Sequence, residues 1–293
     1  MKILVFSSLN IDHNYYVKNI AKPKETIFAS EYNVVSGGKG LNASIALARS
    51  GVHVYLAGNI GNDAKILEKV LADNNVDTTY LNKVDEPNGH AIIQIDENGE
   101  NSIFIYGGSN QSITTEYIDS VLSKFGKGDL LILQNEINNQ IHLINKASEL
   151  GLTIMLNPSP FNDDIYSYPL NKIDYFFINE VEGKGFTNET DPLRILDELK
   201  IMYPKAKVVL TLGSIGAYYQ DDKQRIFQEA FKVKAIDTVG AGDTFMGYFS
   251  YGLSQGFSPE KCLLLATKAS SLTVQRKGAA DSIPTLKEVN EIE

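Results

Sequence analysis

Short apolar segments alternate with helix-like segments along almost the whole 293-residue chain. Six segments have the length and apolar character of buried strands: Ile3–Phe6, Val52–Ala57, Leu130–Gln134, Thr153–Asn157, Tyr175–Ile178 and Val208–Leu212. Helical periodicity is found between them: Leu41–Arg49, Ala64–Asp73, Glu116–Lys124, Gln140–Glu149 and Leu193–Met202. This alternation predicts an α/β fold with a mostly parallel sheet that helices cover on both faces.

Two segments interrupt the alternation early in the chain. Asn14–Val35 has mixed polarity and no helical period, and His90–Tyr106 has the pattern of a hairpin that turns at Asp96–Glu100. We expect these two segments to form a small β-sheet that lies over one end of the main sheet as a lid. Further along, Tyr218–Phe231 predicts a second hairpin, and the tail Asp237–Asn290 is mainly helical. We expect one domain over residues 1–293, with lid segments inserted at about 12–35 and 88–107.

Composition excludes several classes of protein. The formal net charge is −9, and no basic run is longer than two residues, so nucleic acid and anionic membranes are not expected partners. The single Cys262 cannot form an internal disulfide and indicates a reducing compartment, which predicts the cytoplasm. The first apolar run, Ile3–Phe6, is too short for a signal peptide or a membrane span. The four histidines have no zinc-ligand spacing.

The segment Asp237–Phe245, with the sequence DTVGAGDTF, leads into a predicted helix over Phe245–Leu253. Its glycines allow a tight turn, and a helix N-terminus adds partial positive charge, so the segment suits an anion or a developing negative charge. A carboxylate at Asp243 would repel a resting anion. It is explained if Asp243 accepts a proton from a substrate hydroxyl during phosphoryl transfer. The structural alternative is a helix cap after a glycine turn.

A second glycine-rich segment, Gly37–Ala43, opens the first long predicted helix with the sequence GGKGLNA. Gly38, Gly40 and Ala43 formally match the dinucleotide fingerprint. That motif should directly follow the first strand, whereas here a lid segment intervenes. In the alternative interpretation, the glycines bring backbone amides close to a polar ligand, and Lys39 and Asn42 add side-chain hydrogen bonds. A plain glycine-rich helix entry is the third reading.

The chain contains no P-loop sequence, so any phosphoryl transfer must use other elements. Asn179 and Glu182 follow a predicted strand, where oxygen atoms could hold Mg²⁺ through water. A helix cap with first-turn acids explains these two residues equally well. Thr211–Gly216 leaves another strand, and its glycines and hydroxyls suit a flat base or a phosphate.

Taken together and in order, these motifs resemble the ribokinase-like (PfkB) sugar kinase family, and within it the ribokinases most. The similarity covers essentially the whole chain. Its two glycine signatures are G-G-K-G-x-N at Gly37–Asn42 and D-T-x-G-A-G-D at Asp237–Asp243. The accompanying motifs are N-x-D from Asn10, Glu136 after Gln134-Asn135, N-P-x-P at Asn157–Pro160, N-x-x-E at Asn179–Glu182, the loop Thr211–Gly216 and the tail Arg276–Ala279.

The resemblance implies a three-layer α/β/α fold and a kinase that moves the ATP γ-phosphoryl group to a primary hydroxyl of a free sugar, with D-ribose the leading substrate. Asp243 would be the base, and backbone N–H groups of the turn would stabilise the phosphoryl group: Gly240, Ala241, Gly242 and Asp243. The sugar would be held by Asn10, Asp12, Gly38, Lys39, Gly40, Asn42 and Glu136, together with Asp243. The nucleotide would contact Asn179, Glu182, Thr211, Gly213, Ser214, Gly216, Gly242 and Thr267.

The resemblance also implies two metals. Mg²⁺ would be held by Glu182 through water. A monovalent cation, K⁺, would be held by a loop made of Asp237, Val239, Thr273, Arg276, Gly278 and Ser282. Two departures from the family pattern affect this assignment. Thr267 stands where ribokinases often place Asn or His near adenine, and Thr273 and Ser282 occupy positions where the backbone carbonyl matters more than the side chain.

Several alternatives stay open from the sequence. Another kinase of the family could act on fructose, deoxyribose or a nucleoside, for which Tyr15, Tyr16 or Tyr106 could form an aromatic slot. A phosphosugar is disfavoured because the sugar-side motifs contain no arginine. An NAD-dependent oxidoreductase rests on the weak glycine match alone, and a sugar-binding regulator without catalysis has no use for Asp243.

The predicted lid is too apolar for two solvated faces, which predicts a homodimer that forms through the lid. Seven residues carry this prediction: Val34, Val35, Ile92, Ile93, Ile95, Ile103 and Ile105. The expected arrangement has one face of the lid over the sugar and the second face against another subunit. Packing onto the chain's own core is the alternative.

Overall fold

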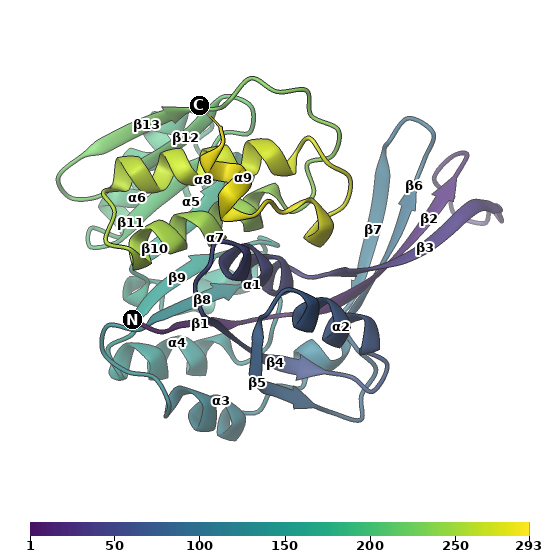
Figure 1. Cartoon of the computed structure of the whole chain (residues 1–293), viewed down its shortest axis with the longest axis horizontal. Coiled ribbons are helices and arrows are strands. Elements are labelled where there is room, and N and C mark those ends of the chain that lie inside the picture. The colour runs from purple at the N-terminus through teal and green to yellow at the C-terminus, as the bar shows by residue number, and fades with distance from the viewer. Residues whose placement is uncertain (293) are drawn as a thin grey trace.

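A computed structural model describes residues 1–292 and contains a central nine-stranded sheet with the strand order β13-β12-β11-β10-β9-β8-β1-β4-β5 (Figure 1). The strands from β5 to β11 run parallel, and β12 and β13 continue the sheet as an antiparallel hairpin. The strand bounds are β1 Ile3–Phe6, β4 Val54–Ile60, β5 Asp77–Lys83, β8 Leu130–Gln134, β9 Thr153–Asn157, β10 Tyr175–Asn179, β11 Lys207–Thr211, β12 Gly216–Gln220 and β13 Arg225–Glu229.

Helices cover both faces of this sheet (Figure 1). Their bounds are α1 Lys39–Arg49, α2 Lys65–Asp73, α3 Thr115–Leu122, α4 Gln140–Glu149, α5 Glu180–Thr187, α6 Pro192–Met202, α7 Ala241–Ser254, α8 Pro259–Thr273 and α9 Leu286–Asn290. Side chains alternate along each strand, so Val5 packs in the core beneath α1, α7 and α8, and its neighbour Phe6 packs in the core beneath α3 to α6. The predicted fold class is confirmed, with the expected mostly parallel sheet between two helical layers.

Three elements differ from the sequence-based expectation. The edge strand β5 was not predicted, because Asp77–Lys83 is polar and half exposed and so lacks a buried-strand pattern. The short helix α5 contains two glycines and was considered only as the helix-cap alternative for Asn179 and Glu182. Helix α7 begins at Ala241 and not at Phe245, so the glycine turn itself forms the first helical turn. Asp243 therefore lies inside the helix and not before it.

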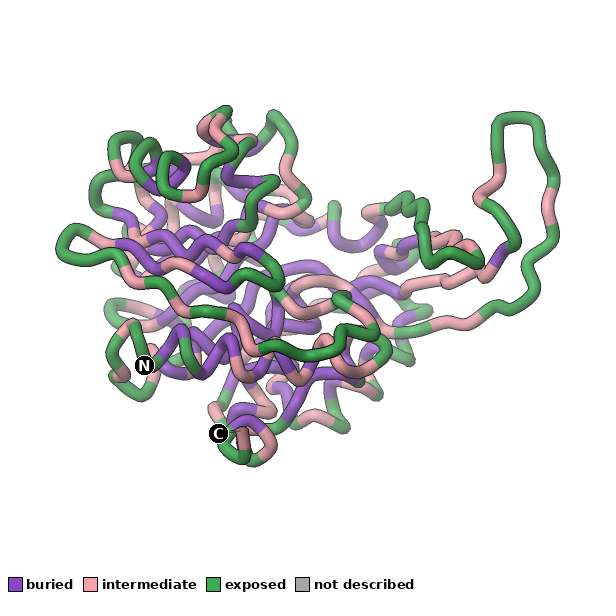
Figure 2. Tube along the Cα trace, turned by 90° about the horizontal axis from the view of Figure 1, so that it is seen from above, coloured by how far each residue is buried: buried purple, intermediate pink, exposed green. Residues whose placement is uncertain are grey.

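A separate four-stranded sheet, with the order β3-β2-β6-β7, forms the lid and projects from the body (Figure 1). Its strands are β2 Asn10–Val17, β3 Ala29–Gly37, β6 His90–Ile95 and β7 Asn101–Tyr106. Burial decreases from the root of this sheet to its tip (Figure 2). Both β2 and β3 join the body directly, because β2 follows β1 and β3 leads into α1. No helix within residues 1–292 combines the length and apolar character that crossing a membrane requires.

Candidate active site

The N-terminus of α7 provides free backbone donors. Its N-cap, Gly240, has a left-handed backbone with φ 77°, and no side chain caps the helix. The N–H group of Ala241 donates to the Thr238 carbonyl at 3.3 Å, whereas those of Gly242 and Asp243 donate to no acceptor in the described chain. A side chain at Gly242 would meet nothing within 4 Å, so the turn faces open space. Such a helix end can receive an anionic group.

Asp243 lies in the first turn of α7 and is buried, with 9% of its surface exposed. The Asn42 side chain, on α1, donates from Nδ2 to Asp243 Oδ2 at 2.9 Å. Burial raises the Asp243 pKa to about 6, Lys39 and Asn42 oppose this rise, and Glu136 adds to it. A carboxylate with this pKa is ionised at neutral pH and is basic enough to accept a hydroxyl proton in a transition state.

Lys39 and Glu136 form the second part of the site, where α1 begins beside the end of β8. Lys39 Nζ lies 3.5 Å from Glu136 Oε1, and the Lys39 backbone N–H donates to Glu136 Oε2 at 3.3 Å. The buried Ser8 hydroxyl donates to the same oxygen. Ser8 belongs to the polar stretch that ends β1, but no motif in the sequence singled it out. The carboxylate is therefore held by three donors, and a ligand hydroxyl would meet it in a defined orientation.

Asp12 and Asn10 stand at the root of the lid, on β2. Burial is the main cause that raises the Asp12 pKa to about 6; Glu136 raises it further and Lys39 opposes the rise. Asn10 is buried, and its Oδ1 accepts a hydrogen bond from Asn110 Nδ2 at 2.7 Å. Asn110 also binds the backbone of Leu9 and so supports the turn into the lid. No pattern in the sequence pointed to Asn110.

The glycines of the Gly37–Asn42 signature are required by close packing. A Cβ atom at Gly37 would lie 2.0 Å from Asp12 Oδ2, and one at Gly40 would lie 2.4 Å from Ser7 Cβ. Gly38 has φ 95° and approaches the Asn10 backbone. These contacts join the start of α1 to the β1–β2 segment, which brings Lys39, Asn42, Asn10 and Asp12 to one place. The signature follows lid strand β3 and not β1, so it is not a dinucleotide fingerprint.

The electrostatic balance of the site is acidic. Lys39 interacts with Glu136, Asp243 and Glu182, which outweigh burial and raise the Lys39 pKa. Within the described residues it is the one cation that affects the pKa values of Asp12, Asp243 and Glu182. A polyphosphate entering this site would meet several carboxylates and little positive charge, and a divalent cation bound with it would reduce this repulsion.

Asn179 and Glu182 join β10 to α5 in a capping box. Asn179 Oδ1 accepts from the N–H groups of Val181 and Glu182 at 2.8 and 3.1 Å, and Glu182 Oε2 accepts from the Asn179 N–H at 2.6 Å. The side-chain oxygen of Asn179 is thus used by the helix. Glu182 is buried, burial raises its pKa, and its interactions with Ser159 and Lys39 place it at the site. Its other oxygen, Oε1, suits a hydrated Mg²⁺.

The Thr211–Gly216 loop connects β11 with β12 at the same end of the sheet. Gly213 has φ 54°, and Gly213 and Ser214 are exposed. The Thr211 hydroxyl donates to the Ile178 carbonyl at 3.3 Å. A Cβ at Gly216 would lie 2.2 Å from the Gln228 carbonyl oxygen, so this glycine serves the hairpin. Thr267 is buried within α8, where its hydroxyl donates to the Leu263 carbonyl at 2.8 Å.

The residues of the expected cation loop come together around Asp237. Its carboxylate accepts from the Val239 N–H at 3.0 Å and from the Gly278 N–H at 2.9 Å, which ties the glycine turn to the segment after α8. Arg276 pairs with Glu288 at 2.6 Å and reaches the Ser282 carbonyl at 3.5 Å.

The hydroxyls of the loop are used within the protein. Thr273 Oγ1 lies 3.2 Å from Thr244 Oγ1, and the Ser282 hydroxyl donates to the Ala279 carbonyl at 2.7 Å. The side chains of Thr273 and Ser282 are therefore committed, and their backbone carbonyls accept from Arg276 at 3.1 and 3.5 Å. The Asp237 carboxylate is the charged oxygen donor that this loop would offer a monovalent cation.

Known proteins resemble this chain in sequence and in fold. A family model described as pfkB family carbohydrate kinase matches residues 1–286. A ribokinase of Staphylococcus aureus strain COL is 34% identical over 306 residues, covering 99% of both chains, and a deoxyribokinase of Salmonella typhi is 29% identical over 306 residues, covering 99% of this chain and 98% of the relative. The solved structure of Arabidopsis thaliana ribokinase complexed with ribose and ATP has a TM-score of 0.89 at 29% identity, with 99% and 97% coverage.

Proposed function

The chain belongs to the pfkB family of carbohydrate kinases, and we propose that it transfers the γ-phosphoryl group of ATP to the primary hydroxyl of D-ribose, yielding D-ribose 5-phosphate. One observation carries the proposal. The buried Asp243 carboxylate, whose pKa is raised to about 6, lies in the same helical turn as the free N–H groups of Gly242 and Asp243. A base and an anion-binding helix end in one turn suit an attacking hydroxyl and the phosphoryl group it receives.

In the proposed reaction, Asp243 accepts the proton of the sugar hydroxyl. The hydroxyl oxygen forms a bond to the γ-phosphorus, and the bond from that phosphorus to the bridging oxygen of ADP breaks. The free amides of Gly242 and Asp243, which the turn at Gly240 and Ala241 directs outward, stabilise the negative charge on the transferring group. When bound near Glu182, Mg²⁺ supplies the positive charge that the acidic site lacks. The loop Thr211–Gly216, with Asn179 and Thr267 nearby, receives the nucleotide.

The sugar is proposed to lie between the root of the lid and the start of α1. Asp12 and Glu136 accept hydrogen bonds from its hydroxyls, while Lys39 and Asn10 donate. Asn42 Oδ1 is buried and has no partner among the described residues, so it is available to a hydroxyl donor. Gly38 and Gly40 allow the backbone at the start of α1 to approach the sugar closely. The name of the Staphylococcus relative and the ribose-bound Arabidopsis structure support ribose as the substrate.

Deoxyribose is the second candidate, because the Salmonella relative is named a deoxyribokinase. A nucleoside is less well supported. The sheet register places Tyr15 and Tyr106 on the face of the lid opposite to Asp12, where Tyr106 packs against His90 with ring centroids 5.2 Å apart. Only Tyr16 shares the face of Asp12, so the three tyrosines do not form one slot over the sugar.

The deciding experiment measures ADP formation with ATP, Mg²⁺ and a panel of D-ribose, 2-deoxy-D-ribose, D-fructose, inosine and fructose 6-phosphate. We expect the highest kcat/KM with D-ribose. A higher kcat/KM with any other compound would replace ribose as the substrate, and ADP formation that is independent of all of them would contradict a sugar kinase. We propose that the reaction takes place in the cytoplasm, where ATP is available.

A further inference from the structure

Asn110 is a buried residue outside the sugar-contacting motifs, yet it bonds directly to one of their members. It lies on the short 3₁₀ helix η1, Gly108–Gln111, which follows the lid strand β7. Its Nδ2 donates to Asn10 Oδ1 at 2.7 Å, and the residue is only 2% exposed. Asn10 is proposed to donate to the sugar, so the partner of its side chain affects which of its two polar atoms the sugar meets.

The backbone of Leu9 fixes the orientation of the Asn110 carboxamide. The Leu9 N–H donates to Asn110 Oδ1 at 3.1 Å, and Asn110 Nδ2 donates to the Leu9 carbonyl at 3.2 Å. A backbone N–H can only donate and a carbonyl can only accept, so exchanging the oxygen and the nitrogen of Asn110 would place like groups against each other at both contacts. Asn110 therefore points its nitrogen at Asn10.

The orientation of Asn110 in turn fixes that of Asn10. Because Asn10 Oδ1 accepts from Asn110, the nitrogen of Asn10 lies on the other side of its carboxamide. That nitrogen has no acceptor among residues 1–292, and it is not sealed from solvent. Asn10 and Asp12 are two positions apart on β2, so their side chains share one face of the lid. A free donor therefore stands beside the acceptor Asp12, where the sugar is proposed to lie.

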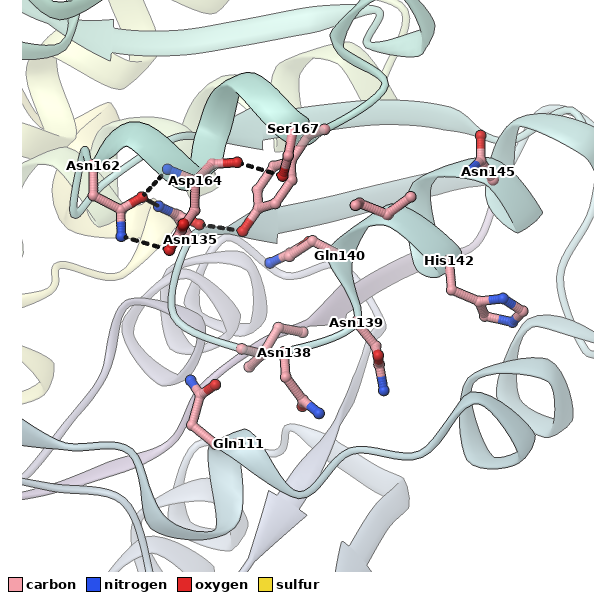
Figure 3. A pocket seen from close by; sticks show the side chains of 13 residues that line it. Gln111, Asn135, Asn138, Asn139, Gln140, His142, Asn145, Asn162, Asp164 and Ser167 are labelled. Atoms are coloured by element: carbon pink, nitrogen blue, oxygen red, sulfur yellow. Dashed lines mark hydrogen bonds between the residues drawn. The ribbon is translucent and has the colours of Figure 1, made fainter.

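The turn that carries Asn110 is also tied to the second acidic residue of the proposed sugar site. The next residue, Gln111, donates from Nε2 to the Glu136 carbonyl at 3.0 Å. Figure 3 shows Gln111 reaching from this turn toward the loop that follows β8, at the wall of a polar cavity. One turn therefore holds the Asn10 side chain and the main chain at Glu136, which come from different parts of the sequence.

We infer that Asn110 is a positioning residue that sets the polarity of the sugar site. It holds Asn10 so that a nitrogen, and not an oxygen, meets the ligand, and the hydroxyl at this point must accept a hydrogen bond; that the ligand is a sugar rests on the proposed function. The same hydroxyl can donate to Asp12, because a hydroxyl has one donor and two acceptor lone pairs. An analogue without this hydroxyl leaves Asn10 Nδ2 unpaired, which lowers its affinity.

Neutron diffraction from deuterated crystals of the ligand-free full chain tests the orientation directly, because it distinguishes a deuterated nitrogen from an oxygen. We expect the deuterated nitrogen of Asn10 to point away from Asn110. A deuterated nitrogen of Asn10 that points at Asn110 overturns the inference. This measurement needs no activity. It therefore decides the orientation even in a chain that forms no ADP with any sugar, a result that contradicts the proposed function alone.

Kinetics test the consequence for the substrate. We compare kcat/KM for D-ribose with that for analogues that lack the hydroxyl at C1, C2 or C3. In the wild-type protein, we expect one analogue to be about tenfold or more worse than D-ribose, mainly through KM. In Asn110→Asp, assayed at pH 8, the carboxylate has no hydrogen to donate, so Asn10 turns its nitrogen toward it. The preference should then fall below about threefold, with kcat for D-ribose changed less than KM.

Asn88→Asp is the matched control. Asn88 is buried at the same root of the lid and also donates to the Leu9 carbonyl, at 3.0 Å, but it forms no hydrogen bond with Asn10. This variant should lose stability as Asn110→Asp does and keep the tenfold preference. If Asn110→Asp does not fold, Asn110→Leu, which is similar in size and has no polar side-chain atoms, should show the same loss of preference. An Asn110 variant that keeps the wild-type preference overturns the positioning role, and so does a loss of preference that Asn88→Asp shares.

Discussion

At the scale of single residues, the site depends on carboxylates that are buried beside one cation. Asp12 and Asp243 come from different layers of the fold, yet burial raises the pKa of each to about 6. Lys39 opposes both shifts, and Glu136 adds to both. The two groups therefore titrate near pH 6, and three predictions follow from their protonation.

Replacing the proposed base tests its role directly. Asp243→Asn keeps the shape of the side chain and an oxygen that can accept from Asn42, but it removes the basic group. We expect kcat to fall by about a hundredfold or more and the affinity for ribose to change far less. Steady-state kinetics and ribose binding measure the two effects, with the exposed Asp222→Asn as the control. A variant that retains near-normal kcat rules out the assignment.

The pH dependence of kcat/KM follows from the same pKa values. Below about pH 6 both Asp243 and Asp12 gain protons, so the base is blocked and a hydrogen-bond acceptor for sugar is lost. We expect kcat/KM to decrease as pH falls through 6, more steeply than a single group allows. In the Asp12→Asn variant, we expect the pH dependence of kcat/KM to follow the titration of one group, Asp243. A profile that stays flat between pH 5 and pH 7, in about 0.1 M salt, is incompatible with this view.

Stability should change in the opposite direction. The folded Asp243 pKa lies above the unfolded value of 3.8, so the folded state binds more protons between about pH 4 and pH 6, and stability is lost as pH rises through that window. Asp243→Asn removes the free-energy cost of keeping an ionised carboxylate buried. We expect it to be more stable than wild type at pH 7, by up to about 3 kcal/mol, with the difference vanishing near pH 4. Urea unfolding at both values checks this, and a variant destabilised at pH 7 would refute it.

At the scale of elements, the start of α7 depends on a contact with the segment after α8. The Asp237 carboxylate accepts hydrogen bonds from the N–H groups of Val239 and Gly278. The chain then continues from Val239 into the turn that carries Asp243. Neither the segment at Asp237 nor the segment after α8 forms this arrangement alone. We propose that K⁺ bound beside Asp237 holds the direction of the amides from Gly240 to Asp243 without touching the substrate.

Replacing K⁺ with Na⁺ at constant ionic strength should lower kcat severalfold and alter ribose affinity modestly, since the smaller ion leaves carbonyl ligands poorly placed. Asp237→Ala should abolish the difference between the two salts. Initial rates are compared at saturating Mg²⁺ and ATP. Equal rates of the wild-type protein in both salts would refute the cation site, leaving Asp237 as a loop tether.

At the scale of the whole molecule, the projecting lid leaves apolar surface uncovered. The strand register revises the expected distribution of its apolar residues. Val34 and Ile92 lie on the face opposite to Asp12, whereas the other five share the face of Asp12: Val35, Ile93, Ile95, Ile103 and Ile105. Ile103 and Ile105 are 51% and 53% exposed, and they lie on the edge strand β7. The sugar needs only the root of this face, so its outer part is free for a partner.

We propose that two chains dimerise through their lids. Light scattering at micromolar concentration should give twice the monomer mass, and Ile103→Lys combined with Ile105→Lys should give a monomer with a raised KM for sugar. Lys69→Ile on α2 is a surface control that should leave the mass unchanged. A wild-type chain that is strictly monomeric in this measurement contradicts the dimer.

The sequence by itself determined the layers of the fold and predicted most of the residues of the candidate site. The period of the apolar residues follows from local geometry, so β1, β8, β9 and α4 could be predicted at their observed bounds. The glycine signatures and the carboxylates were visible because a tight turn and a base need particular residue types. The polar edge strand β5 was not visible, and α5 was visible only through its cap at Asn179, because contacts with neighbouring elements override their weak local preferences.

Only the tertiary structure decided which groups meet and how they are charged. Asn42 and Asp243 are 201 positions apart in the chain, and their hydrogen bond exists because α1 packs beside α7. Ser8 and Asn110 support the site through contacts that no spacing predicts. The raised pKa values of Asp12 and Asp243 and the uncapped start of α4 likewise arise from burial and from partners distant in sequence, which a one-dimensional pattern does not contain.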